Sequence, residues 1–432
     1  MARFLLATIP IVGHVTPMLP VAKMLVDRGH DVWWYSGQAF QSRIERTGAR
    51  FAAMENALDY SIVENVPTEW VERRQSLKGL AQLKFDLAHF FVEAAIGNTQ
   101  DLLHILQQFP ADAFVVDSFF MAAAWASEIA EIPWAQLGIS VMTFPSRDTA
   151  PFGLGMPPSA SWLGRLRNTT LHWLMRNVAF RDIYARINQA RSQFSLPPTR
   201  AGVFDLVSPY LYMAGVTAGF EYPRSDLPPQ VHFIGPSISE SLLEFSPPSW
   251  WDDMARAKSV VHVTQGTVAL NARDLLVPTM QALADEDVLV VATTVNDPAE
   301  SLGDFSIPAN ARVERFIPHH ALLPHVDVMV TNGGFNGIQM ALARGIPIVA
   351  AGKSEDKPEV CARLARSGAG IDLKTQTPTP AQLKQANARI LSHTSYRDNA
   401  QRLQQDIQAC QSDERAADLL ETLVQTQQPV RC

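Results

Sequence analysis

Two series of alternating strand and helix patterns run along this chain, and they restrict its fold more than any other feature. In each series, short continuous apolar runs typical of buried parallel strands are separated by segments whose apolar residues recur at helical spacing. Such alternation is typical of doubly wound sheets. The sequence therefore predicts an α/β protein with two Rossmann-like doubly wound domains that face a central cleft.

The predicted elements set the domain boundaries. A proline-rich segment separates the two series, and 432 residues are too many for one ordinary core. We predict a first domain over 1–220, a linker over 221–250, a second domain over 251–394, and a helical tail over 395–432 that can pack back on the first domain. Predicted strands cover 4–9, 32–35, 114–116, 135–139, 260–264, 288–293, 312–317, 328–331, 346–351 and 370–373.

Composition excludes several classes of protein. The net charge is −7, which argues against a nucleic-acid partner because such proteins present a basic face. The three cysteines, Cys361, Cys410 and Cys432, lie far apart and fit a reduced protein. We expect a cytoplasmic protein without stable membrane insertion, since the chain shows neither a long apolar span nor a signal-peptide pattern at its N-terminus. Its oligomeric state stays open.

The most informative stretch joins the predicted strand 328–331 to a helix through Asn332, Gly333 and Gly334, followed by Asn336 and Gly337. Glycine lets a backbone approach a ligand closely, and the start of a helix offers unpaired N–H groups to a diphosphate. An ordinary glycine-rich turn between a strand and a helix is the alternative interpretation.

The next predicted strand leads to a second candidate position. Asp356 and Lys357 follow it, and ligands of such sheets bind beyond the carboxyl ends of the strands. A carboxylate there can accept hydrogen bonds from sugar hydroxyls. Alternatively, Asp356 only caps the helix that starts near Pro358.

Together these segments resemble the donor-binding signature of family 1 glycosyltransferases, which have the GT-B fold and use UDP-sugars, and in particular the bacterial natural-product and macrolide-type enzymes. The resemblance covers both domains in the same order, except for about 59–235. It rests on the segments 10–17, 263–267, 315–319, 332–337, 345–347 and 356–358.

The resemblance implies a role for each donor-site residue. Phe316 would stack on the uracil ring, and Pro318 and His319 would line the base. Gly334, Asn336 and Gly337 would meet the diphosphate, and Asp356 and Lys357 would meet the sugar hydroxyls. The same donor site would include Gly266, Thr267, Asn332 and Gly333.

Four of these positions depart from the family pattern. Phe316 stands where Trp is usual, Asn332 where His is usual, Gly337 where Ser or Thr is common, and Lys357 where Gln is common. Lysine adds a charge and loses an acceptor. The resemblance therefore leaves the identity of the sugar open.

His14 is the candidate catalytic base. It follows the first strand at the ligand-binding edge of the sheet, and an imidazole suits proton removal near neutral pH. Asp117 follows the predicted strand 114–116 at the same edge, and an Asp in this position pairs with the His in the family that the chain resembles. A carboxylate of this kind orients an imidazole. Alternatively, both residues only cap the helices that follow them.

The resulting prediction is an inverting O-glycosyltransferase. It would transfer a hexose from a nucleotide diphosphate sugar, UDP-glucose by resemblance, to a hydroxyl of a small hydrophobic acceptor such as a natural product. The first domain would hold the acceptor and the second the donor. The nucleotide sugar is a substrate, so we expect neither a cofactor nor a metal site. A nucleotide-sugar epimerase and a non-catalytic sugar-nucleotide binding protein are the alternatives.

Overall fold

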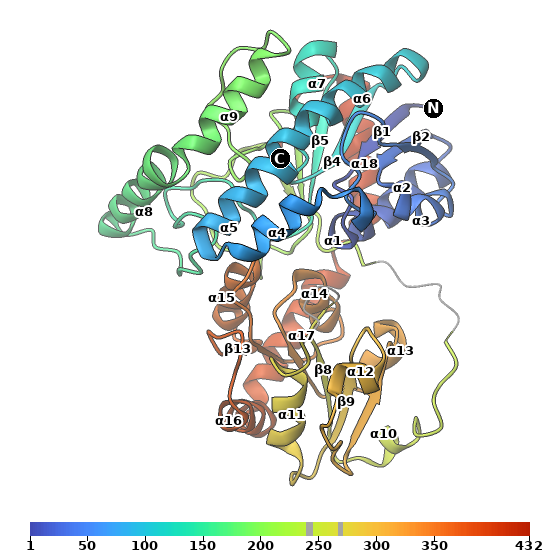
Figure 1. Cartoon of the computed structure of the whole chain (residues 1–432), viewed down its shortest axis with the longest axis vertical. Coiled ribbons are helices and arrows are strands. Elements are labelled where there is room, and N and C mark those ends of the chain that lie inside the picture. The colour runs from blue at the N-terminus through green and yellow to red at the C-terminus, as the bar shows by residue number, and fades with distance from the viewer. Residues whose placement is uncertain (239–244, 267–270) are drawn as a thin grey trace.

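The computed structural model describes residues 1–238, 245–266 and 271–432, and it forms two α/β domains, one above the other in Figure 1. Every strand pair in both sheets is parallel. The predicted fold class is confirmed. The N-terminal sheet has the order β3-β2-β1-β4-β5-β6-β7, and the C-terminal sheet has the order β10-β9-β8-β11-β12-β13.

The strands are short and mostly buried, as parallel strands covered on both faces are. In the N-terminal sheet they are β1 (Arg3–Ala7), β2 (Asp31–Ser36), β3 (Arg50–Ala53), β4 (Ala113–Asp117), β5 (Trp134–Gly138), β6 (Leu211–Ala214) and β7 (Val231–Phe233). In the C-terminal sheet they are β8 (Val260–Thr264), β9 (Leu289–Thr293), β10 (Ala311–Glu314), β11 (Val328–Thr331), β12 (Ile348–Ala350) and β13 (Gly370–Asp372).

Helices cover both faces of each sheet. Those of the N-terminal domain are α1 (Val12–Val15), α2 (Leu19–Asp27), α3 (Gln41–Glu45), α4 (Thr68–Ser76), α5 (Gly79–Asp86), α6 (Ala94–Gln108), α7 (Ala122–Ala130), α8 (Trp162–Leu174) and α9 (Arg181–Ser192), with 3-10 turns η1 (Thr16–Met18), η2 (Gln38–Phe40) and η3 (Val63–Asn65) and π turns η4 (Leu87–Glu93) and η5 (Met175–Ala179). The remaining ones are α10 (Asp253–Arg256), α11 (Leu276–Leu283), α12 (Pro298–Leu302), α13 (His319–Leu322), the 3-10 turn η6 (Leu323–His325), α14 (Phe335–Leu342), α15 (Lys357–Ser367), α16 (Pro380–Ser392), α17 (Thr394–Gln408) and α18 (Ser412–Thr426).

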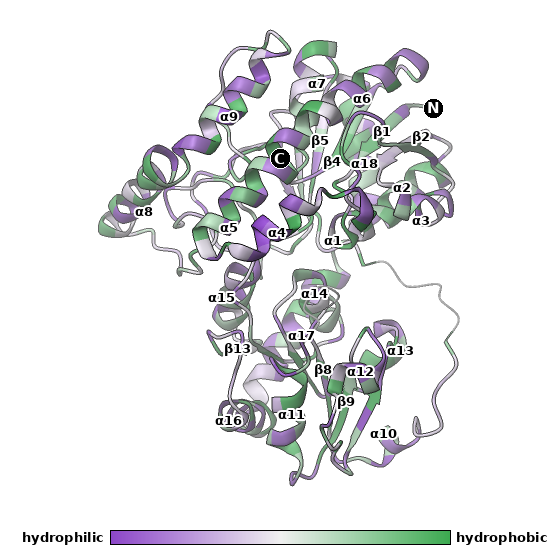
Figure 2. Cartoon of the chain, in the orientation of Figure 1, coloured by the Kyte–Doolittle hydropathy of each residue, from purple (hydrophilic) through white to green (hydrophobic). Residues whose placement is uncertain are grey.

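Each sheet contributes to two hydrophobic layers because side chains alternate along a strand. In β1, Phe4 and Leu6 belong to the layer that includes α2 and α18, and Leu5 and Ala7 belong to the layer that includes α6 and α7. Figure 2 shows the central strands as mostly hydrophobic, whereas outer helices such as α9 carry many hydrophilic residues.

Three strands of the N-terminal sheet were not among the predicted ones. The strand β3 is half exposed, β6 has four residues, and β7 has three residues flanked by prolines, so none produces a long apolar run. The strand β7 lies inside the predicted linker 221–250, and Glu221 is buried there as well. The N-terminal domain therefore extends beyond residue 220.

A short helix follows β1 and leads into α2. It starts at Val12, and Thr16 lies in the 3-10 turn that joins α1 to α2. His14 therefore sits on a helical turn and not in an extended loop.

The C-terminal tail crosses from one domain to the other. α17 contacts α14 and α16, and the backbone then bends at Gln411, whose φ is +46°. α18 packs against α2 of the N-terminal domain, where Arg28 Nη1 donates to Asp418 Oδ1 at 2.7 Å. Among the helices of the described residues, none is long and apolar enough to cross a membrane.

Candidate active site

His14 and Asp117 meet at the carboxyl-terminal edge of the N-terminal sheet. Their Nδ1 and Oδ1 atoms lie 3.0 Å apart, although the residues are far apart in sequence. β4 carries Asp117 and β1 leads into the turn that carries His14, and these two strands are neighbours in the sheet. The parallel arrangement brings both strand ends to the same edge.

Asp117 is completely buried, and backbone amides hold it in place. Its Oδ2 accepts from Ile9 N at 2.8 Å, and its Oδ1 accepts from Phe119 N at 2.9 Å. A carboxylate can only accept hydrogen bonds. His14 Nδ1 therefore carries the proton that Asp117 accepts, and the lone pair of Nε2 is left free to take up a proton.

An apolar cavity of about 290 Å³ lies in the same domain. Aromatic rings connect it with His14. Phe119 lies 5.7 Å from the His14 ring and 6.2 Å from the ring of Phe204, which lines the cavity together with Phe152 and Trp173. Pockets of this apolar character and modest size are typical binding sites for small hydrophobic molecules.

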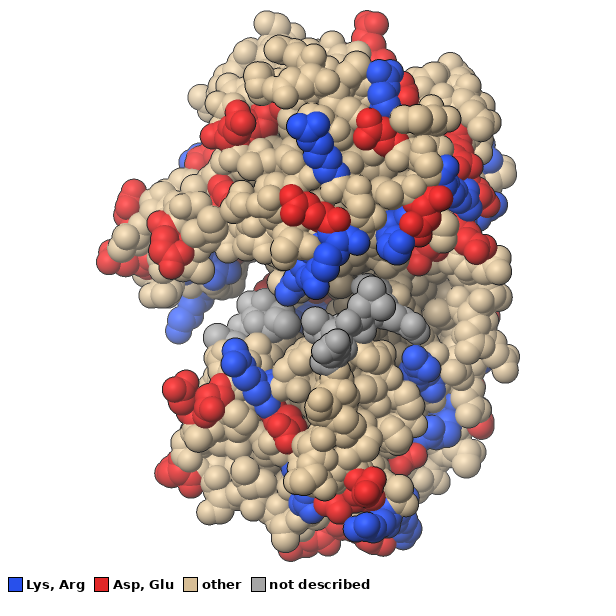
Figure 3. All heavy atoms as spheres, turned by 90° about the vertical axis from the view of Figure 1, so that its right-hand side faces the viewer, with Lys and Arg blue, Asp and Glu red and all other residues tan. Residues whose placement is uncertain are grey.

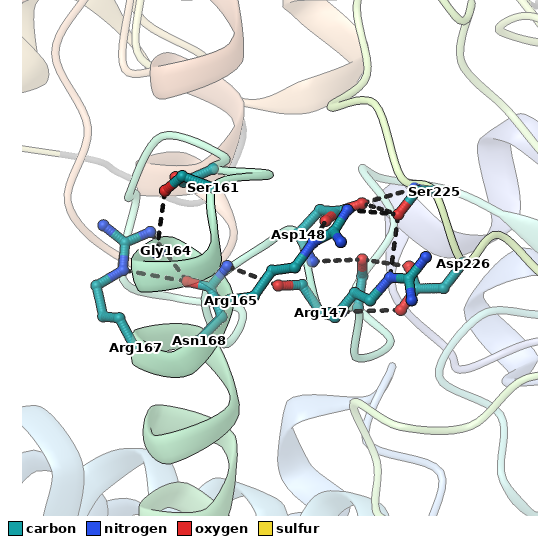
Figure 4. A network of polar contacts seen from close by, with 11 residues as sticks. Arg147, Asp148, Ser161, Gly164, Arg165, Arg167, Asn168, Ser225 and Asp226 are labelled. Carbon is teal, nitrogen blue, oxygen red and sulfur yellow. Dashed lines mark hydrogen bonds and ion pairs between the residues drawn. The ribbon is translucent and has the colours of Figure 1, made fainter.

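A polar network (Figure 4) supports the segment 143–152, which is the wall segment of this cavity. This segment contributes Thr143, Pro145, Pro151 and Phe152 to the lining. Asp148 accepts from Arg165 Nε at 2.8 Å and from Ser225 N at 2.7 Å, which ties the wall segment to α8 and to the segment after β6. Burial acts to raise the pKa of Asp148, but the hydrogen bonds from Ser225 and Arg165 outweigh it and lower that pKa to about 2. The network is therefore ionised at neutral pH.

The turn between β11 and α14 contains two adjacent glycines with different roles. The backbone conformation requires glycine at Gly333, whereas the position where Gly334 would carry a side chain is open. Gly333 has a φ of +85°, and a Cβ there would collide with Cys361 Sγ. Gly334 is the residue before α14, and a Cβ on it would meet, among the described atoms, Asn332 Oδ1 at 3.8 Å. The unpaired N–H groups of the first turn of α14, which contains Asn336 and Gly337, begin beside this open space.

Asn332 is bound to the neighbouring glycine turn. Its side-chain amide donates to the carbonyl of Gln265, one residue before Gly266, whose φ is +70°. The turns after β8 and β11 are therefore linked. Thr267 lies outside the described residues.

The residues predicted at the nucleobase lie after β10. Phe316 is 59% exposed, so its side chain is available for stacking, and Pro318 is buried at the start of α13. His319 contacts the buried His262 edge-on at 5.6 Å between ring centroids. Burial lowers the pKa of His319 to about 4 and that of His262 to about 3, so both rings are neutral near pH 7.

The side chains of Asp356 and Lys357 both bind other side chains of the protein in this structure. Asp356 Oδ2 accepts from Ser140 Oγ at 2.5 Å across the domain boundary, and burial raises the pKa of Asp356. Lys357 Nζ pairs with Glu355 and donates to Ser354 Oγ at 3.1 Å. Asp356 precedes α15, but its side chain makes no capping bond with the described amides of that helix. Asp356 thus occupies the N-cap position that the capping alternative assigned to it, without the side-chain hydrogen bond of a cap among the described residues.

The sequence reasoning missed the residues that join the two domains. Ser140 contacts Asp356, and Glu359 and Arg363 on α15 bind backbone and carboxylate groups of the N-terminal domain. An i, i+4 Glu–Arg spacing on α15 was the available signal, but such spacing is common on exposed helices. Figure 3 shows a hollow between the two domains, with acidic and basic side chains interspersed over both.

The described residues include no group of three or more His, Cys, Asp or Glu side chains that could hold a metal ion.

Comparison with known proteins shows the family of this chain. Residues 277–423 match the family model "Erythromycin biosynthesis protein CIII-like, C-terminal domain". The chain is 47% identical to 4'-demethylrebeccamycin synthase of Lentzea aerocolonigenes, over 98% of this chain and 100% of that protein. It belongs to the GT-B glycosyltransferases. A second relative, UDP-glycosyltransferase 2 of Phaeomoniella chlamydospora, is 32% identical over 97% of this chain and 95% of its own length.

Solved structures of glycosyltransferases share this fold. The glycosyltransferase of kitacinnamycin superposes with a TM-score of 0.75 and 21% identity, over 98% of each chain. The recognised family and the enzyme class are thus confirmed, and sugar transfer is favoured over the two alternatives, epimerisation and non-catalytic binding.

Proposed function

We propose that this glycosyltransferase moves a hexose from a uridine diphosphate donor to a hydroxyl of a small apolar acceptor, with inversion at the anomeric carbon. The observation that carries the proposal is the His14–Asp117 pair. Asp117 is anchored by two backbone amides and orients the imidazole, and the ring of Phe119 links that imidazole to the apolar cavity. The N-terminal domain would hold the acceptor and the C-terminal domain the donor.

In this mechanism His14 Nε2 takes the proton of the acceptor hydroxyl as its oxygen attacks the anomeric carbon. The bond between the sugar and the diphosphate breaks on the opposite side, which inverts the centre. Asp117 stabilises the imidazolium that forms. The N–H groups at the start of α14 would stabilise the charge that develops on the leaving diphosphate, without a metal ion.

The proposed donor-site roles belong to residues of the C-terminal domain. Phe316 offers an exposed ring for the nucleobase, and the space beside Gly334 suits the diphosphate. Asp356 would exchange its hydrogen bond with Ser140 for one with a sugar hydroxyl. The named UDP-glycosyltransferase relative supports uridine as the base.

A product assay tests this proposal. The enzyme is incubated with UDP-glucose or with dTDP-glucose and a panel of polycyclic aromatic and macrocyclic alcohols, and the products are analysed by mass spectrometry and NMR. We expect a β-glucoside from the α-linked UDP donor. An α-glucoside, or transfer that occurs only from the thymidine donor, contradicts the proposed mechanism or the proposed donor.

A further inference from the structure

One face of α15 carries the polar contacts between the two domains. Glu359 and Arg363 are four residues apart on the helix, and Asp356 directly precedes its first turn, three residues before Glu359. All three contact the N-terminal domain: Asp356 binds Ser140, Glu359 binds the segment 153–155, and Arg363 binds Glu221. The helix that begins at the donor-site residues thus also contacts segments near the acceptor cavity.

Glu359 connects two different partners through its two oxygens. Oε1 accepts from Gly153 N at 3.0 Å and from Gly155 N at 2.7 Å, and Oε2 accepts from Arg363 Nη1 at 2.8 Å. The Glu359 side chain is 6% exposed. A buried carboxylate is costly unless its acceptor sites are filled, and here they are filled by two amides and one guanidinium.

Arg363 closes the network on the other side. Its Nε donates to Glu221 Oε1 at 2.5 Å, and its guanidinium lies over the Tyr222 ring at 3.9 Å. Glu221 also accepts from Met142 N at 2.8 Å. Burial acts to raise the pKa of Glu221, but the nearby Arg363 and Arg224 outweigh it, and the carboxylate stays ionised at neutral pH.

The segment that Glu359 holds is part of the acceptor cavity. Pro151 and Phe152 line the cavity, and Gly153 and Gly155 come one and three residues after Phe152 in the sequence. Both glycines have positive φ values, +95° and +58°, and a Cβ on Gly155 would come within 3.0 Å of the Pro358 carbonyl oxygen. One side of this short segment therefore faces the cavity, and the other lies against the first turn of α15.

We propose that Glu359 is a positioning residue that fixes the cavity segment 151–155 against the donor-site end of α15. This inference rests on the proposed function, because it assigns the cavity to the acceptor and the start of α15 to the donor sugar. Glu359 would set the position of Phe152 in the acceptor wall relative to Asp356 and Lys357. Its loss would then weaken acceptor binding without removing a group that touches the donor.

The test compares Glu359→Gln with the wild-type enzyme. The amide side chain keeps the volume of glutamate but has one acceptor oxygen instead of two, and its NH₂ group must face either Arg363 or the two glycine amides. With UDP-glucose as donor and 4-methylumbelliferone as the acceptor probe, we expect the acceptor KM to rise about tenfold. The affinity for UDP measured by calorimetry should stay within about twofold of the wild-type value.

Hydrogen exchange gives a readout that does not depend on turnover. The amides of Gly153 and Gly155 should exchange faster in Glu359→Gln, and those of α14 should not change. The matched control is Glu128→Gln, which removes the carboxylate partner of another buried arginine, Arg191, at 2.7 Å within the N-terminal domain. That control should lower the melting temperature and leave the acceptor KM and the exchange of 151–155 unchanged.

A second variant covers the case in which Glu359→Gln folds poorly. Gly155→Ala strains the same segment while leaving the charges in place, and it should raise the acceptor KM in the same way. An acceptor KM within about twofold of wild type in a folded variant overturns the proposal. Unchanged exchange of Gly153 and Gly155 in Glu359→Gln also overturns it. A wild-type enzyme without any transfer would instead contradict the proposed function, and the exchange measurement would still decide the role of Glu359.

Discussion

His14 Nδ1 lies 3.0 Å from Asp117 Oδ1, and backbone amides of Ile9 and Phe119 bind the same carboxylate. The carboxylate therefore cannot rotate away from the imidazole without giving up buried hydrogen bonds. The tautomer and the orientation of His14 are thus set by the fold before any substrate arrives. Single substitutions of His14 and Asp117 therefore test the catalytic proposal.

Replacement of His14 by Ala should lower turnover by roughly two to four powers of ten, because the base is lost. Affinity for the donor, measured by calorimetry, should stay near the wild-type value. The control is His30→Ala, since His30 also pairs with a carboxylate, that of Glu421 at 2.9 Å, but precedes β2 at the opposite edge of the sheet. Turnover of His14→Ala close to that of the control would exclude His14 as the base.

Asp117→Asn should cost less turnover than His14→Ala, because the imidazole remains and only its orienting charge is lost. The variant should also be less stable, since the amide NH₂ must face His14 or one of the two backbone donors. Thermal melting and steady-state kinetics separate the two effects. An unchanged melting temperature would mean that the buried carboxylate is not held as described.

The two neighbouring glycines should respond differently to substitution. Gly334→Val should fold normally, because a Cβ there meets Asn332 Oδ1 at an ordinary distance, but it should bind UDP at least about tenfold more weakly. Gly333→Ala should instead lower the melting temperature, because its φ is positive and Cys361 blocks the side chain. Normal UDP binding by Gly334→Val would place the diphosphate elsewhere.

Activity should survive exhaustive chelation, since no acidic or histidine cluster among the described residues is placed to hold a metal ion. The measurement is transfer activity after dialysis against EDTA, compared with the same sample supplied with Mg²⁺ or Mn²⁺. Loss of activity that either ion restores contradicts the mechanism without a metal.

Donor affinity should change little between about pH 6 and pH 8, because His319 has a pKa of about 4 and Asn332 carries no charge. Calorimetric titration with UDP-glucose tests this, since its diphosphate diester does not titrate in that range. A steep rise in affinity on acidification would indicate that a histidine contacts the phosphates.

Acid should destabilise the C-terminal domain through its buried histidines. In the unfolded chain a histidine binds a proton below about pH 6.5, whereas folded His262, with a pKa of about 3, stays neutral. The stability is therefore fully present above about pH 6.5 and falls by about 1.4 kcal/mol per pH unit for each such histidine as the pH decreases toward the folded pKa. His262→Leu should reduce that slope in urea titrations, and an unchanged slope would mean that His262 is protonated in the fold.

The local pattern of the sequence was sufficient to predict the strands of the C-terminal domain. β8 and β11 have the predicted bounds because each is a continuous apolar run that ends at a turn. The glycine turn after β11 was also predictable, since its chemistry depends on adjacent residues. The strand β7 was not, because three residues between prolines produce no recognisable pattern and only pairing with β6 makes them a strand.

The sequence by itself determined the two-domain α/β architecture, the positions of most strands along the chain and the residue types at the donor turn, because these depend on local periodicity and on neighbouring residues. Family resemblance suggested the pairing of His14 with Asp117, but the contacts between distant groups are made only in the tertiary structure. The contact of His14 with Asp117 results from the adjacency of β1 and β4, and the contact of Glu359 with Gly153 and Gly155 results from the docking of one domain on the other. Neither leaves a local signal, because the free energy of a buried charge depends on partners that only the folded chain supplies.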